Sequence, residues 1–152
     1  MILTQILEPS CVKVPLEGKT KEAVITELVD LLEARGLLNN REMVLDAVLM
    51  REQTRSTGIG SGIAIPHGKC KGVKDLVMAI GTTADPIDFE SIDSKPVKIV
   101  VLLVSPTDRT GPHIQALARI SRLMLDESFK EKLEEAKTAE DLYELVSERE
   151  NE

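Results

Sequence analysis

The chain has 152 residues, enough for one domain with a sizeable core, and no Pro-rich or Ser/Gly-rich linker divides it, so we expect a single domain over 1–152. Its formal charge of -7 at pH 7 repels phosphate backbones and anionic headgroups, which argues against nucleic acid or a membrane as a partner. Two cysteines are too few for a disulfide framework, and no signal peptide or membrane span is evident. These features predict a cytoplasmic protein.

The first third of the chain predicts one strand and two helices. Residues 11–16 (CVKVPL) alternate as a strand does. Residues 21–35 repeat apolar side chains at helical spacing after an N-cap at Thr20. A second helix is expected from a capping box opened by Asn39 to about Gln53.

The middle of the chain predicts a glycine-rich loop followed by three strands. The run STGIGSG at 56–62 is expected to be irregular, because glycine lets the backbone turn sharply or approach a ligand. Short strands are expected at 63–65 and 76–83. The apolar run VKIVVLLVS at 97–105 predicts a central strand that is buried on both faces.

The last third predicts three helices. A loop from Pro106 to Pro112 leads into the first, 113–126, with Pro112 expected at the first helical position. Residues 127–137 predict a short helix, and a capping box opened by Thr138 begins the last one.

The glycine run matches neither of the usual nucleotide-binding motifs. A dinucleotide site needs G-x-G-x-x-G between a strand and a helix, whereas Gly58, Gly60 and Gly62 alternate between a helix and a strand. For a P-loop the spacing from Gly62 to Lys69 is wrong, and Cys70 stands where a hydroxyl must hold magnesium. No nucleotide cofactor is expected.

A metal site would have to draw on His67, Cys70, His113 and Cys11. His67 and Cys70 have a tolerable ligand spacing, but no second closely spaced pair exists in the sequence. The sequence therefore favours no metal.

Three side chains could together support phosphoryl transfer onto an imidazole. His67 follows a strand end between a proline and a glycine, and His113 begins a helix, whose N-terminus favours a bound anion. Arg51 lies near the end of the helix that precedes the glycine run, and a guanidinium grips phosphoryl oxygens through two parallel hydrogen bonds. Taken singly, each is expected to be an ordinary surface residue, so the hypothesis depends on their meeting in space.

The segment RE...STGIGSGIAIPHG, followed by HIQALARIS, resembles the enzyme IIA domain of the bacterial phosphotransferase system, in the class that serves fructose and mannitol and includes a nitrogen-related branch. The resemblance covers almost the whole chain. It implies an α/β fold with a mixed β-sheet flanked by helices, which brings His67, His113 and Arg51 together.

The resemblance also implies a function. His67 would accept a phosphoryl group from phosphorylated HPr and pass it to a cysteine of a IIB protein or domain in fructose-type sugar uptake. His113 and Arg51 would contact the phosphoryl oxygens, with no metal or other cofactor. The alternative is a nitrogen-branch regulatory module whose phosphorylation state controls docking to other proteins.

Overall fold

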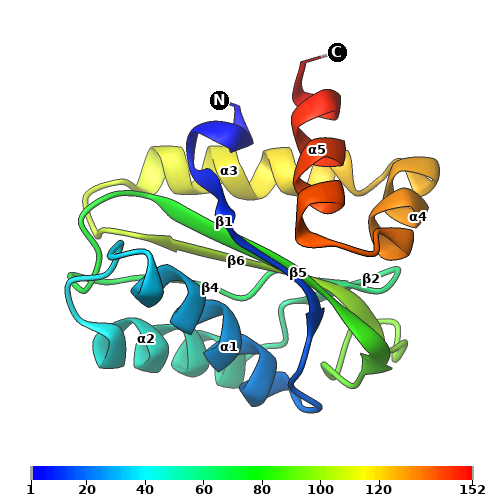
Figure 1. Ribbon diagram of the computed structural model, residues 1–152. Coiled ribbons are helices and arrows are strands. Elements are labelled where there is room, and N and C mark those ends of the chain that lie inside the picture. The colour runs from blue at the N-terminus through cyan, green and yellow to red at the C-terminus, as the bar shows by residue number, and fades with distance from the viewer. Residues whose placement is uncertain (1, 152) are drawn as a thin grey trace.

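A six-stranded mixed sheet with helices on both faces organises the computed structural model, which describes residues 2–151 (Figure 1). This confirms the α/β fold that the resemblance implies. The elements in chain order are η1 (Leu3–Gln5), β1 (Leu7–Leu16), α1 (Lys21–Ala34), α2 (Arg41–Thr54), β2 (Gly58–Gly60), β3 (Ile63–Ala64), β4 (His67–Lys69), β5 (Val77–Ile87), β6 (Val97–Ser105), α3 (Thr110–Leu123), α4 (Glu127–Glu135) and α5 (Ala139–Glu150).

Strand β6 is the centre of the sheet, as its apolar run predicts. The order is β1-β5-β6-β3-β2, and β4 also pairs with β6. β5 runs antiparallel to β6, while β3 and β4 run parallel to it in succession along its other edge. Every residue of β6 except Lys98 is buried, because helices cover both faces of the sheet.

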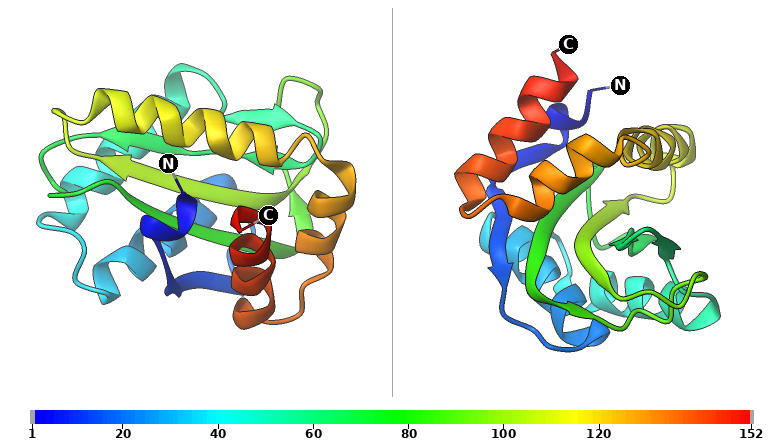
Figure 2. Two further views of the ribbon diagram at one scale, coloured as in Figure 1. Left: turned by 90° about the horizontal axis from the view of Figure 1, so that it is seen from above. Right: turned by 90° about the vertical axis from the view of Figure 1, so that its right-hand side faces the viewer.

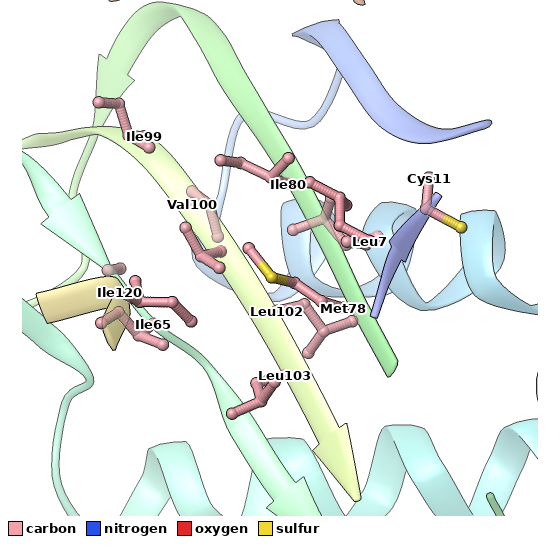
Figure 3. Packing of buried hydrophobic residues seen from close by; sticks show 14 of the residues in the cluster. Leu7, Cys11, Ile65, Met78, Ile80, Ile99, Val100, Leu102, Leu103 and Ile120 are labelled. Atoms are coloured by element: carbon pink, nitrogen blue, oxygen red, sulfur yellow. The ribbon is translucent and has the colours of Figure 1, made fainter. Parts of the chain in front are cut away.

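The helices form two layers. α1 and α2 lie on one face of the sheet, and α3, α4 and α5 lie on the other (Figures 1 and 2). α1 packs against β1 and β5, while α2 packs against β4. Figure 3 shows Met78 and Ile80 of β5 beside Val100 and Leu102 of β6, in the aliphatic core that the composition predicts. The strand and helix that carry the candidate site are thus held by a continuous core.

Two helix starts differ from the sequence predictions. The N-cap of α2 is Asn40 and not Asn39, since the Asn40 side chain accepts from the Met43 amide, while the backbone amides of both residues donate to the Gly72 carbonyl. α3 begins at Thr110, so Pro112 is the third helical residue and not the first. Proline is tolerated there because the first four amides of a helix have no partner within it.

The glycine run is more regular than its sequence predicts. Gly58–Gly60 and Ile63–Ala64 form an antiparallel hairpin, so the expectation of an irregular loop was wrong. Positive φ values at Gly60, Ser61 and Gly62 turn the chain sharply between the strands. Asp93 accepts from the Ser61 amide, and Lys130 donates to the Ser61 carbonyl, so the turn is held from two sides.

Helices suited to crossing a bilayer are absent from residues 2–151, since none is both long and apolar enough.

Candidate phosphoryl-transfer site

His67 lies on a strand and not in the loop that the sequence predicts. It begins β4 and pairs in register with Leu103 of β6. The carbonyl of Pro66, just before it, accepts from the Leu103 amide, so the chain joins the sheet on both sides of the imidazole. The backbone that carries His67 is therefore rigid, while the ring itself is only half-buried.

One ring nitrogen of His67 has its protonation state fixed by the backbone. Nδ1 lies 2.6 Å from the Ile65 carbonyl oxygen. Because a carbonyl oxygen only accepts, Nδ1 must carry the proton and donate. In the neutral ring Nε2 then keeps its lone pair, which makes it the nucleophilic nitrogen.

The surroundings of His67 also favour the neutral ring. Burial lowers its pKa below the usual 6.5, and the nearby guanidinium of Arg51 lowers that pKa further, while the bond to the Ile65 carbonyl opposes both. A ring with a lowered pKa is neutral, and hence nucleophilic, throughout the neutral pH range.

His113 lies beside His67, although the two are far apart in the sequence. The ring centroids are 5.5 Å apart with the planes tilted by 59°. His113 is in the first turns of α3, and its side chain is buried, with Nδ1 2.7 Å from the hydroxyl oxygen of Ser105. Burial, followed by the charges of His67 and Lys69, lowers its pKa to about 4. His113 is therefore neutral at neutral pH.

The buried His113 predicts a loss of stability in mild acid. An unfolded chain takes up a proton on this ring near pH 6.5, whereas the folded protein does so only near pH 4. The free energy of unfolding should fall as the pH drops through that window, by at most about 3 kcal/mol. Urea unfolding between pH 7.5 and pH 4 measures the slope, and His113→Gln, which cannot titrate, should flatten it. An equal slope in both proteins would contradict this assignment.

Arg51 and His67 line the same surface pocket. The pocket has a volume of about 280 Å³, and its other lining residues are Arg55, Ser56, Thr57, Ile59, Ile65, Ile92, Leu117 and Ser121. Arg51 Nη1 donates to the carbonyl of Arg55 at 2.8 Å, which directs the guanidinium toward the start of the glycine hairpin. These lining residues include two arginines and no carboxylate. The pocket therefore suits an anion, even though the chain as a whole is acidic.

A buried carboxylate beside Arg51 escaped the sequence analysis. Glu52 accepts from the backbone amide of Thr57 at 2.6 Å and from the Thr57 hydroxyl, and it lies 3.8 Å from the ammonium of Lys21. This network fixes the end of α2 against the glycine hairpin. The sequence does indicate that Glu52 is buried, because it follows Val44 and Val48 at four-residue spacing and so occupies the apolar stripe of α2.

Within residues 2–151 no three His, Cys, Asp or Glu side chains are grouped so that they could hold an ion. Of the four residues weighed for a metal, His67 and His113 meet, whereas Cys11 lies on β1 at the far edge of the sheet. Cys70 is buried just after β4, with its amide bonded to the Ser105 carbonyl.

Comparison with protein families gives a match over nearly the whole chain. Residues 5–149 match the family described as "Phosphoenolpyruvate-dependent sugar phosphotransferase system, EIIA 2". The chain is 36% identical over 97% of its length to the PTS system fructose-specific EIIABC component of Bacillus subtilis, of which it covers 23%. It is 34% identical over 96% of its length to the nitrogen regulatory protein of Klebsiella oxytoca, of which it covers 90%.

A solved structure agrees with the fold. The nitrogen regulatory protein IIA-Ntr of Neisseria meningitidis superimposes with a TM-score of 0.82 at 30% identity, covering 93% of this chain and 97% of that one. The mannitol IIA of Escherichia coli gives 0.78 at 22% identity, over 91% of this chain and 97% of that one, a likeness of fold.

Proposed function

The chain belongs to the EIIA 2 family of the phosphoenolpyruvate-dependent sugar phosphotransferase system, and on that basis we propose that it carries a phosphoryl group on His67. The group comes from phosphorylated HPr and goes to a cysteine of an EIIB protein or domain. In this proposal the whole chain, 1–152, is one phosphocarrier domain that works in the cytoplasm.

The two transfers need no chemistry beyond substitution at phosphorus. Nε2 of His67 attacks the phosphorus on the donor, so that one N–P bond forms while the donor's bond to phosphorus breaks. In the second step a cysteine thiolate attacks, an S–P bond forms, and the Nε2–P bond breaks. Phosphoryl transfer has a loose transition state, so positioning and charge stabilisation dominate the rate.

Each residue of the site has a different role in these two transfers. The Ile65 carbonyl holds Nδ1 of His67 and leaves Nε2 free for the attack. Arg51, in the same pocket, binds the phosphoryl oxygens through its guanidinium. His113 lies beside the reacting ring and donates a neutral N–H to the same oxygens. The observation that carries the proposal is a neutral imidazole with a free Nε2 on a pocket that holds Arg51.

We favour fructose-type uptake as the pathway, and regulation is the second candidate. Relatives named as fructose-specific EIIA and EIIABC components support the first. Relatives named as nitrogen regulatory proteins support the second, in which phosphorylation switches docking to another protein. A solved complex of a mannitol IIA with phosphorylated IIB, which shares this fold, suggests an EIIB partner in the first case.

A phosphorylation assay tests the proposal. The chain is incubated with phosphorylated HPr, and mass spectrometry should find one added phosphoryl group that is lost in acid, as a phosphohistidine is. Adding purified EIIB proteins one at a time should identify an acceptor that removes the group. A chain that remains unmodified, or one modified only on a serine or threonine, would refute the proposal.

A further inference from the structure

Ser105, which lies just inside the site, has no role in the function proposed above. It ends β6 and is fully buried, and it pairs in register with Lys69 of β4, as Leu103 pairs with His67. Its hydroxyl oxygen is 2.7 Å from Nδ1 of His113, which belongs to α3, so the Ser105 side chain lies on the face of the sheet that α3 covers.

The direction of this hydrogen bond follows from what surrounds the hydroxyl. Within residues 2–151 the Ser105 hydroxyl has no other hydrogen-bond partner than His113. If Nδ1 of His113 donated, the buried O–H hydrogen would be left without an acceptor, at a cost of about 1–3 kcal/mol. If the hydroxyl donates to Nδ1 instead, the hydroxyl hydrogen of Ser105 and the Nδ1 lone pair of His113 each have a hydrogen-bond partner.

The direction of the bond decides which tautomer His113 adopts. A neutral imidazole carries one proton, so an Nδ1 that accepts from Ser105 leaves the proton on Nε2. His113 is neutral at physiological pH, since its pKa is about 4. The ring then offers an N–H donor to a neighbouring anion, and not a lone pair that would repel it.

We propose that Ser105 is a positioning residue for phosphoryl transfer, whose buried hydroxyl donates to Nδ1 of His113 and so keeps Nε2–H available to the phosphoryl group on His67. The kinetic part of this inference rests on the proposed function. The tautomer itself does not, because it is a property of the unmodified protein.

The tautomer is measured first, by nitrogen NMR of the histidine rings in the wild-type protein at pH 7 without any phosphoryl donor. The two histidines are distinguished by His67→Ala. The expected result for His113 is an unprotonated Nδ1 and a protonated Nε2. A protonated Nδ1 on His113 would overturn the inference without the need for any Ser105 variant.

The effect on transfer is measured with two variants of Ser105. Ser105→Ala removes the donor but keeps the backbone bond to Cys70, and we expect His67 to be phosphorylated by phosphorylated HPr about fivefold more slowly, as the loss of one hydrogen bond implies. The His113 signals of this variant should show a second tautomer. Ser105→Thr keeps the hydroxyl and should restore both the rate and the single tautomer.

Thr83→Val is the matched control. The Thr83 hydroxyl is also buried but has no hydrogen-bond partner among residues 2–151, and Thr83 lies on β5 toward the opposite end of the strands from His67. Its removal should leave both the rate and the His113 tautomer unchanged. A Ser105→Ala rate equal to that of Thr83→Val would overturn the role in transfer, whereas a wild-type chain that accepts no phosphoryl group would refute the proposed function and leave the tautomer test intact.

Discussion

Replacing His67 by alanine is expected to abolish the phosphoryl adduct, lowering the rate of transfer from phosphorylated HPr by at least about a thousandfold. His67 is the one histidine whose Nε2 has a free lone pair on the pocket, because the Ile65 carbonyl holds the proton on Nδ1. We expect His113 not to take its place, since its own Nδ1 is engaged by Ser105, which would leave the proton on Nε2 and no lone pair for the attack. The rate is measured by mass spectrometry after rapid mixing with phosphorylated HPr.

His113→Ala is the informative comparison for this loss. It removes the second ring and leaves the nucleophile, so its adduct should survive and be located on His67, with slower onward transfer to an EIIB cysteine. Thermal unfolding of both variants verifies that the folds are intact. An adduct that persists in His67→Ala, or that moves to His113, would contradict the assignment of the nucleophile.

The long elements of the fold follow from the sequence, whereas the short strands β2 and β4 do not. The apolar run of β6 and the amphipathic patterns of α1, α2 and α3 extend over many residues, so periodicity identifies them. β2 and β4 have three residues each, too few for any period to appear, while β3 was predicted by the apolar residues at 63–65. β4 is a strand through its pairing with β6, and β2 is a strand through its pairing with β3, and neither pairing is visible within the short segment itself.

Dependence on tertiary contacts also explains why the sequence predictions at the site were wrong for His67 and incomplete for Ser105. His67 was placed in a loop because the strand that contains it becomes visible only through its register with Leu103. The three candidate residues were found by their chemistry, but their proximity came from the family resemblance and not from any spacing in the sequence. Ser105 was missed because a serine after an apolar run is typical of the end of a strand, and its contact with His113 depends on how α3 packs over β6.

The site combines two polar contacts, one part-buried and one buried, that act on different rings. The Ile65 carbonyl, which only accepts, leaves His67 with a free nucleophilic Nε2. The Ser105 hydroxyl, which donates, would leave His113 with a proton on Nε2. In this proposal the two neighbouring neutral imidazoles have opposite properties, one suited to attack phosphorus and the other suited to bind its oxygens.

Arg51→Ala is expected to slow phosphorylation of His67 about a hundred- to a thousandfold, because it removes the guanidinium that lies in the pocket beside the reacting ring. Arg51→Lys keeps the charge but loses the two parallel hydrogen bonds, so its rate should fall by about tenfold. Arg122→Ala, which removes an exposed arginine of α3 outside this pocket, should transfer at the wild-type rate. The three rates are measured in one assay at fixed salt, since screening weakens the attraction of any cation for the phosphoryl group. If Arg51→Ala and Arg122→Ala gave the same rate, the guanidinium of Arg51 would have no part in binding the phosphoryl oxygens.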